Sequence, residues 1–425
     1  MKNPYGEIYG YLKDIEIIDT HEHLPPWEKK RNTDGDVFSE FLQHYMNRDL
    51  ISAGMPPETC GKLLTSGLTI REKWELASPY WEYCRYTGYG RSLEIAVRDI
   101  YGISQIDGST IEALNDAFRQ SMNEGHYEKV LHEMSHIKVS ILDALEPEFS
   151  PPDPAFFRPV RRINRFVFPL GGADLMDLER ESGVTISTFD DYLEACDIAV
   201  AHYAEYCAGL KCSLAYDRSL YFPRAARCDA ERAFNEFFRS NYYIEREERI
   251  FCPGEAFQNY MMHHVLNAAQ KHHMVIQMHT GMQEGSGNIV SNSNPALLSN
   301  LFLEYPGVRF DIFHIGYPYY HELGALAKMF PNVYADMSWA HILCPAAARS
   351  ALSEWLESVP YNKIFGFGGD YCLVDGVYAH QYMARIHISR VLADKVEEGL
   401  FDTDKAKEIG RAILYDNPAN LFGIK

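Results

Sequence analysis

Short apolar runs alternate with longer helical stretches over most of the chain after residue 136. Runs of about four to eight apolar residues are typical of buried strands, and apolar residues three or four positions apart are typical of helices. The predicted strands are Ile15–Asp19, Ile137–Leu142, Arg165–Phe168, Gly209–Leu214, Met274–His279, Arg309–His314, Val333–Asp336 and Ile364–Gly368. The predicted helices are Phe189–Cys207, Glu255–His273, Ala296–Glu304, His321–Phe330, Pro345–Ser358, Gln381–Glu397 and Thr403–Leu414. This alternation predicts βα units and a parallel sheet.

Eight βα units are the number found in a (β/α)₈ TIM barrel, so we expect one barrel that spans residues 1–425. The segment 28–136 departs from the alternation. It shows helical spacing from Val37 to about His136 and contains no predicted strand. A connection of this length is too long for an ordinary βα loop. The sequence therefore predicts a distorted barrel with a helical insertion, residues 28–136, after the first strand.

Composition limits the classes of partner. The chain is 46% apolar and 23% charged, with a formal net charge of −19. Such an acidic chain offers no basic surface for nucleic acid or for an anionic membrane, and no apolar run approaches the roughly 18 residues of a membrane span. Nine dispersed cysteines without CxxC pairs are typical of a reducing compartment. We expect a cytoplasmic homo-oligomer that acts on a small molecule.

Two histidines follow the first predicted strand, one residue apart. Side chains at positions i and i+2 of a strand point the same way, so His21 and His23 can offer two imidazoles to one ion. An isolated His-x-His is equally consistent with two solvated loop histidines. Later strand ends add His279, His314 and Asp370. In TIM barrels the carboxyl ends of the strands carry catalysis, so we expect these side chains on one rim.

Imidazole and carboxylate ligands on a barrel rim suit a divalent cation with an open coordination position. Such an ion lowers the pKa of a bound water, and a nearby carboxylate can then move the proton. We therefore expect one divalent metal ion, with Zn²⁺ as the first choice and Mn²⁺ as the alternative.

The order of these motifs along the chain is similar to that of a known superfamily. His-x-His after strand one, histidines after strands five and six, and aspartate after strand eight resemble the amidohydrolase superfamily, in the branch of uronate isomerases and metal-dependent decarboxylases. The resemblance implies that His21, His23 and Asp370 hold the metal. It makes His279 a further ligand or a close neighbour. It also implies that His314 contacts the substrate or its developing negative charge.

Two residues inside or at the end of strands have alternative interpretations. Lys211 lies within the fourth strand and is predicted to face the pocket as a catalytic group, although a lysine near a strand end can also extend to solvent. Whether it is carboxylated, as in some family members, stays open. Asp336 ends the seventh strand and could orient His314 or a metal ligand, or cap a helix.

The remaining rim positions suggest substrate contacts. Arg218 follows the fourth strand and could bind a substrate carboxylate with two parallel hydrogen bonds, or pair with Asp217 instead. Tyr317, Trp339 and His341 follow strands six and seven and are predicted to wall the pocket.

These interpretations predict a metal-dependent hydrolase of the amidohydrolase type. Activated water would attack a C–N or C–O bond of a small, polar, carboxylated substrate, with Asp370 as ligand and proton shuttle and with His314 and Lys211 as further catalytic groups. A non-oxidative decarboxylase and an aldose–ketose isomerase of a sugar acid are the alternatives that use the same metal site. A scaffold without chemistry is the non-enzymatic alternative, and the intact set of ligand-type residues argues against it.

Overall fold

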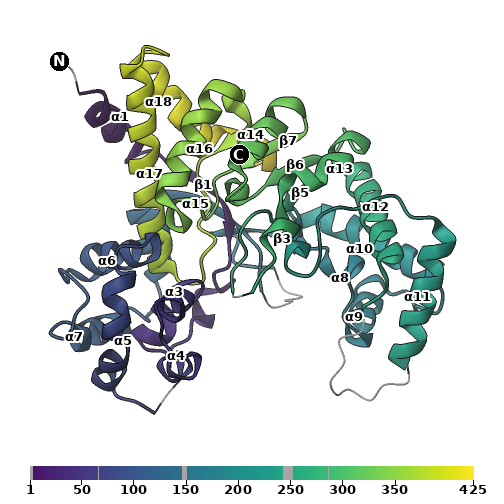
Figure 1. The fold of residues 1–425 in the computed structure, drawn as a ribbon, viewed down its shortest axis with the longest axis horizontal. Coiled ribbons are helices and arrows are strands. Elements are labelled where there is room, and N and C mark those ends of the chain that lie inside the picture. The colour runs from purple at the N-terminus through teal and green to yellow at the C-terminus, as the bar shows by residue number, and fades with distance from the viewer. Residues whose placement is uncertain (1–2, 66, 146–150, 243–251, 286) are drawn as a thin grey trace.

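Eight parallel strands form one sheet in which neighbours follow the order of the chain, from β1 to β8 (Figure 1). The computed structural model describes residues 3–65, 67–145, 151–242, 252–285 and 287–425. The strands are β1 (Ile17–Glu22), β2 (Ile137–Leu142), β3 (Phe157–Arg162), β4 (Gly209–Cys212), β5 (Val275–Met278), β6 (Arg309–Ile312), β7 (Val333–Asp336) and β8 (Ile364–Phe365). Backbone hydrogen bonds from Thr20 and His23 to the residues after β8 connect the two edge strands. The predicted (β/α)₈ barrel is confirmed.

The third strand is the one strand prediction that is wrong. The structure has β3 at Phe157–Arg162, and most of the predicted strand Arg165–Phe168 is the short helix α8 (Asn164–Val167). The sequence of β3 contains three arginines and a proline, and only two of its six residues are buried. It therefore lacks the apolar run that marks the other strands, whereas the buried Phe166 and Val167 belong to a helix that packs against α12 (Glu255–Lys271).

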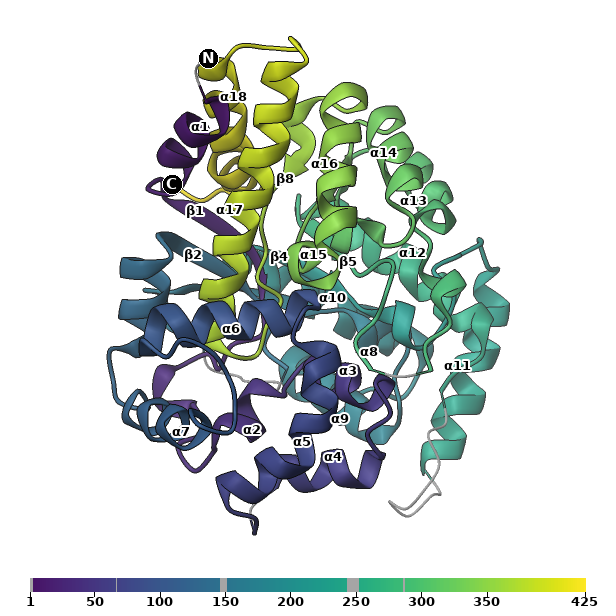
Figure 2. The ribbon, with the colours of Figure 1, turned by 60° about the vertical axis from the view of Figure 1, so that its left-hand side comes forward.

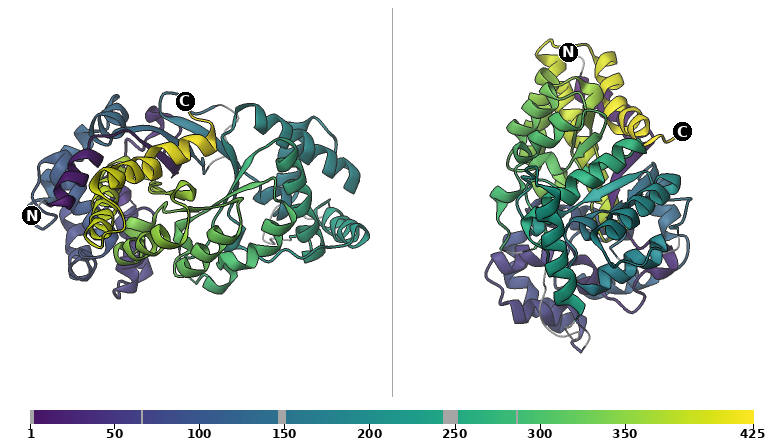
Figure 3. Two further views of the ribbon diagram at one scale, coloured as in Figure 1. Left: turned by 90° about the horizontal axis from the view of Figure 1, so that it is seen from above. Right: turned by 90° about the vertical axis from the view of Figure 1, so that its right-hand side faces the viewer.

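Helices cover the outside of the sheet (Figure 3). After β2 they are α9 (Gly172–Ser182), α10 (Phe189–Tyr206), α11 (Arg227–Tyr242), α12, α13 (Ser299–Glu304), α14 (Tyr320–Met329), α15 (Ala340–Leu343), α16 (Pro345–Ser358), α17 (Val374–Glu397), α18 (Thr403–Arg411) and α19 (Asn417–Phe422). The N-terminal helix α1 (Pro4–Leu12) packs against α17. Helices α1, α9, α11, α15 and α19 were not predicted, and α17 begins seven residues before its predicted start at Gln381. No helix among the described residues is long and apolar enough to cross a membrane.

The chain between β1 and β2 is helical. Its elements are η1 (Glu28–Lys30), α2 (Val37–Phe41), α3 (Met46–Ser52), α4 (Pro57–Leu64), α5 (Ile70–Cys84), α6 (Gly88–Tyr101), α7 (Ile111–Gln120) and η2 (Glu128–Met134). Figure 2 shows these helices gathered at one end of the molecule, where α6 crosses the start of α17. The buried carboxylate of Asp375, at the start of α17, accepts hydrogen bonds from His126 and from the Tyr101 hydroxyl. These bonds fasten the helical segment to the barrel beside the ends of β1 and β8.

Candidate metal centre and active site

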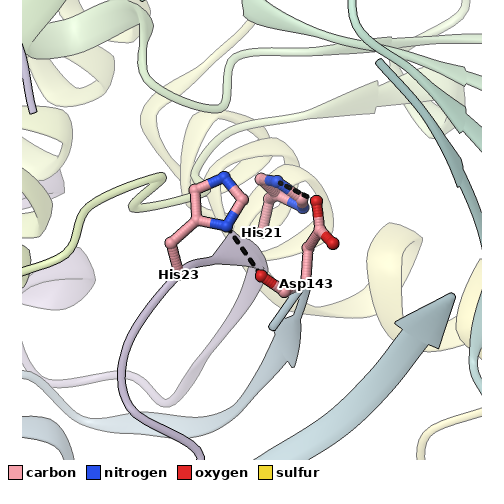
Figure 4. A group of neighbouring side chains, drawn as sticks. All are labelled: His21, His23 and Asp143. Atoms are coloured by element: carbon pink, nitrogen blue, oxygen red, sulfur yellow. Dashed lines mark hydrogen bonds and ion pairs between the residues drawn. The ribbon is translucent and has the colours of Figure 1, made fainter. Parts of the chain in front are cut away.

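Strand β1 delivers the two histidines of the His-x-His motif to the barrel rim. His21 is fully buried within the strand, and His23 lies just beyond its end. The Nδ1–H of His23 donates to the backbone carbonyl of Asp143 at 2.7 Å (Figure 4). That bond fixes the tautomer, so the lone pair on His23 Nε2 is free to bind an ion.

Asp370, after β8, lies between the two imidazoles. Its Oδ1 is 3.2 Å from His23 Nε2 and 3.7 Å from His21 Nε2. Ligand atoms about 2.1 Å from a tetrahedrally coordinated ion lie about 3.4 Å from one another. Burial lowers the pKa of His21 well below its usual value, which keeps this imidazole in the neutral form that binds metals. The three side chains therefore fit a shared divalent cation.

Asp143 joins this centre and was not singled out from the sequence. It follows β2 directly, and its Oδ2 is 3.8 Å from His21 Nε2. Ligand atoms of His21, His23 and Asp143 all lie within 4.8 Å of one another. Both carboxylate oxygens accept from Arg162 Nε at 2.9 Å, and although burial alone would raise the pKa of Asp143, Arg162 holds it below its usual value. Applied to β2, the rule that polar residues at strand ends form the site would have found Asp143.

Lys211 points into the barrel. It is buried, its Nζ donates to His21 Nε2 at 3.3 Å, and its ammonium lies 3.8 Å from the centre of the Phe313 ring. Burial lowers the pKa of Lys211 to about 8. The alternative in which this side chain extends to solvent is therefore wrong, and Lys211 lies beside a candidate metal ligand.

His279 and His314 meet across the rim. His314 Nδ1–H donates to the Ser338 carbonyl at 3.0 Å, and His279 Nε2–H donates to the Met282 carbonyl at 3.0 Å. The remaining nitrogens, His314 Nε2 and His279 Nδ1, are 3.1 Å apart, and Asp370 Oδ2 lies 3.5 Å from the first. Two lone pairs at this distance repel each other, so the pair suits a cation bound between the two nitrogens. This side of the centre also favours positive charge.

Among the described residues, Asp336 is linked to His314 only through Ser338, so both of its interpretations stay predictions. Its Oδ1 accepts from the Ser338 backbone N–H at 2.6 Å, and the Ser338 carbonyl is the acceptor for His314. Asp336 is not among the described residues that line the cavity.

Comparisons with known proteins agree with this geometry. The family model described as amidohydrolase matches residues 245–424. Protein fluG of Emericella nidulans is 31% identical over 148 residues, which are 35% of this chain and 17% of that protein. The uronate isomerase of Thermotoga maritima is 22% identical over 460 residues, covering 98% of this chain and 96% of that enzyme. Residues 245–424 of the chain are thus similar to the amidohydrolase family.

Solved structures show the same fold. The uronate isomerase of Thermotoga maritima has a TM-score of 0.77 at 18% identity, covering 99% of this chain and 98% of that one. The glucuronate isomerase of Caulobacter crescentus also has a TM-score of 0.77, at 17% identity, covering 99% and 94% of the two chains. The fold is thus shared with these isomerases, and the His21, His23 and Asp143 cluster suits a divalent metal ion.

A cavity of about 580 Å³ opens at the candidate metal centre. Its described lining consists of His23, Ser39, Gln43, His44, Asn47, Leu64, Leu145, Arg162, Asn164, Lys211, Ser213, Tyr216, Asp217, His279, Glu284, Trp339, Asp370 and Cys372. Trp339 lines the cavity as predicted from its rim position. The helical segment between β1 and β2 supplies five of these residues, so it forms one wall of the cavity.

His44, in that wall, is a cavity residue that the sequence analysis did not predict. It lies between α2 and α3, with a left-handed backbone (φ +59°), and its Nδ1 hydrogen-bonds to the Tyr89 hydroxyl. Its ring packs against Trp339, with the ring centres 5.3 Å apart. Burial lowers the pKa of His44 to about 4. No sequence signal pointed to it, because it is remote from every strand end.

Three residues that were predicted to contact the substrate are not among the described residues that line the cavity. Arg218 bonds to Gln258, Asn259 and two backbone carbonyls, and it is not among the described residues of the cavity lining. His341 is fully buried, where its Nε2–H donates to the Gly366 carbonyl at 2.9 Å. Tyr317 is also absent from that lining. The arginine beside the centre is Arg162, from a strand that the sequence analysis misplaced.

Proposed function

We propose that this enzyme is a metal-dependent aldose–ketose isomerase of a sugar acid. The observation that carries the proposal is a polar cavity with the guanidinium of Arg162 directed into it beside the histidine–carboxylate centre. The similarity to uronate isomerases over nearly the whole chain supports the same choice over the hydrolase first expected from the sequence. Neither hydrolysis nor isomerisation follows from similarity to the amidohydrolase family alone.

Arg162 is the group that we assign to the substrate carboxylate. Its Nε is engaged by Asp143, while its terminal nitrogens have no hydrogen-bond partner among the described residues. The side chain is 36% exposed, so these nitrogens can meet a ligand. A guanidinium with two free N–H groups binds a carboxylate through parallel hydrogen bonds. The ion pair with Asp143 holds Arg162 at a fixed distance from the metal centre.

The cavity lining suits a substrate with many hydroxyl groups. Half of the described lining residues carry hydroxyl, amide or carboxylate groups, and the apolar side chains are those of Leu64, Leu145 and Trp339, with Cys372 beside them. Its volume lies within the range of about 300–1,000 Å³ that is typical of small-molecule sites. Gln43 and Asn47 come from the helical segment and face residues of the barrel rim across the cavity. A sugar acid could bond to both sides at once.

The reaction needs one proton to move between adjacent carbons and another between their oxygens. A divalent cation in the centre would polarise a substrate carbonyl or hydroxyl oxygen. We assign Asp370 to carry the proton, because its Oδ1 faces the two ligand histidines while its Oδ2 faces His314. Arg162 would fix the carboxylate end, so that the reacting carbons lie over the centre.

Hydrolysis of a C–N or C–O bond is the second candidate. The same position of Asp370 could accept a proton from an attacking water, and the family model that matches residues 245–424 is described as amidohydrolase. The substrate would again be small, polar and carboxylated, because Arg162 lines the cavity in either case.

One experiment separates the candidates. The Zn²⁺- or Mn²⁺-loaded enzyme is incubated in D₂O with a panel of uronic acids, and in parallel with carboxylated amides and lactones, and each mixture is followed by NMR. We expect aldose and ketose acids to interconvert, with solvent deuterium on carbon in the recovered sugar acid. Cleavage of amides or lactones without isomerisation would establish the hydrolase instead. Release of CO₂ would contradict both.

A further inference from the structure

Two buried carboxyl groups lie directly beneath the candidate metal ligands. Asp19 lies within β1 and Glu22 at its end, and neither is exposed. Asp19 Oδ1 accepts from the backbone N–H of His21 at 3.2 Å and from that of Gly369 at 2.9 Å. Each of these bonds involves a metal ligand or its chain neighbour. Asp19 thus joins the two segments that supply ligands.

Glu22, three residues after Asp19, also joins β1 to the residues that follow β8. Its Oε2 accepts from the backbone N–H of His23 at 3.3 Å and from that of Tyr371 at 3.1 Å. Between these two carboxyls, the Asp370 N–H donates to the His21 carbonyl at 2.7 Å. Three consecutive N–H groups after β8 are therefore held by the β1 segment.

The middle residue of that turn needs such support. Asp370 has a left-handed backbone (φ +47°), which costs free energy for a residue other than glycine, although aspartate adopts it more readily than most residues. Its neighbour Gly369 packs flat on Glu22, and a Cβ at that position would lie 1.5 Å from Glu22 Oε1. Glycine there lets the carboxyl of Glu22 reach the Tyr371 N–H. The turn and the acid are thus complementary in shape as well as in hydrogen bonding.

We propose that Asp19 and Glu22 are positioning residues that set the distance between the His21–His23 pair and Asp370. Through four backbone N–H groups the two carboxyls hold the ligand atoms in place before a cation arrives. This inference rests on the ligand set in the proposed function, but not on the identity of the substrate. It predicts that the two acids control metal affinity without touching the metal.

Substitutions at Glu22 test this inference with Zn²⁺ alone as the probe. Glu22→Gln keeps an acceptor at Oε2 and places an amide at Oε1. Glu22→Met is of similar size and has no acceptor for either N–H. Glu22→Asp keeps the carboxyl group, but its side chain is one methylene shorter, which weakens its reach to the Tyr371 N–H. We expect Glu22→Met and Glu22→Asp to bind Zn²⁺ about 10- to 100-fold more weakly, and Glu22→Gln within about threefold of wild type.

Titration calorimetry against a competing chelator measures these affinities, and circular dichroism with a thermal midpoint checks folding. Asp375→Leu is the control, because Asp375 is another buried carboxyl, bonded to the Tyr101 hydroxyl and to His126 and not to a segment that carries a candidate ligand. We expect it to lower the thermal midpoint and leave Zn²⁺ affinity unchanged.

Wild-type affinity in folded Glu22→Asp or Glu22→Met would overturn the inference. So would equal weakening in Asp375→Leu, because Zn²⁺ affinity would then follow general stability. If wild type and His21→Ala bind Zn²⁺ equally, the ligand set itself is wrong and the inference fails with it. The absence of sugar-acid isomerisation alongside the expected affinities would overturn only the proposed reaction.

Discussion

The barrel holds two clusters of buried histidines with different surroundings. The rim cluster is His21, His23, His279 and His314, and the rear cluster, behind β8, is His341, His380 and His387. Burial lowers the pKa of His314 and of His341 to about 4. Both clusters therefore contain neutral imidazoles near pH 7, and charge state alone does not distinguish them.

Their hydrogen-bond partners do distinguish them. In the rear cluster His341 Nε2 and His380 Nδ1 donate to the backbone carbonyls of Gly366 and Gly369. In the rim cluster the free nitrogens converge on the carboxylate of Asp370. Within the described ranges, ligand atoms of His21, His23 and Asp143 lie within 4.8 Å of one another, and Asp370 Oδ1 lies 3.2 Å from His23 Nε2. A metal centre thus needs lone pairs and carboxylates that converge, and histidine number is a poor guide to it.

The largest expected effect is the loss of turnover and of bound metal when a candidate ligand of the rim cluster is replaced. Asp370→Asn and His21→Ala should lower turnover by about 10³-fold or more, equivalent to about 4 kcal/mol. They should also lose bound metal, because each removes a candidate ligand. His341→Gln should keep its metal. Elemental analysis with steady-state kinetics measures both, and a fully active Asp370→Asn protein would refute the assigned centre.

Metal removal should act on the rim cluster alone. Exhaustive chelation is expected to abolish turnover, and added Zn²⁺ or Mn²⁺ to restore it. An ion present at about 1,000 times its Kd stabilises the folded state by about 4 kcal/mol. Chelation should therefore also lower the thermal midpoint, by the same amount in wild type and in His341→Gln. A midpoint insensitive to chelator would argue against a cation at this site.

The rear cluster should affect the pH dependence of the free energy of unfolding. Because the pKa of His341 falls from about 6.5 in the unfolded chain to about 4 in the folded one, the unfolded chain binds more protons between these values. The free energy of unfolding should therefore decrease as pH falls from about 6.5 to 4. In His341→Gln this pH dependence should be smaller, by on the order of 3 kcal/mol across the window. Urea titrations of metal-free protein measure it, and identical slopes in both proteins would count against the prediction.

The smallest effect concerns the arginine beside the rim cluster. Arg162→Lys should raise KM for a carboxylated substrate about tenfold, equivalent to about 1.4 kcal/mol, because an ammonium cannot form two parallel hydrogen bonds. Arg161→Lys is the matched control on the same strand, where Arg161 bonds to the Tyr206 hydroxyl. Equal changes in KM would show that Arg162 has no special part in binding.

The local sequence pattern by itself was enough to predict the barrel architecture and several of the polar residues on its rim. Seven of the eight strands lie where apolar runs predicted them, and the polar residues at their ends indicated His21, His23, His279, His314 and Asp370. Pattern succeeds there because burial and strand-end position are properties of short segments. It failed at β3, whose arginines conceal a strand, and so it misjudged which arginine reaches the cavity.

Tertiary structure alone decided the rest of the site. His44 reaches the cavity only because the helices between β1 and β2 pack over the rim, and Arg162 faces Asp143 because β3 pairs with β2 in a particular register. The carboxyls of Asp19 and Glu22 accept hydrogen bonds from the backbone N–H groups of Gly369 and Tyr371, some 350 positions away in the sequence. Such contacts depend on how distant segments pack against one another, and the pattern of a single segment carries no record of its partner.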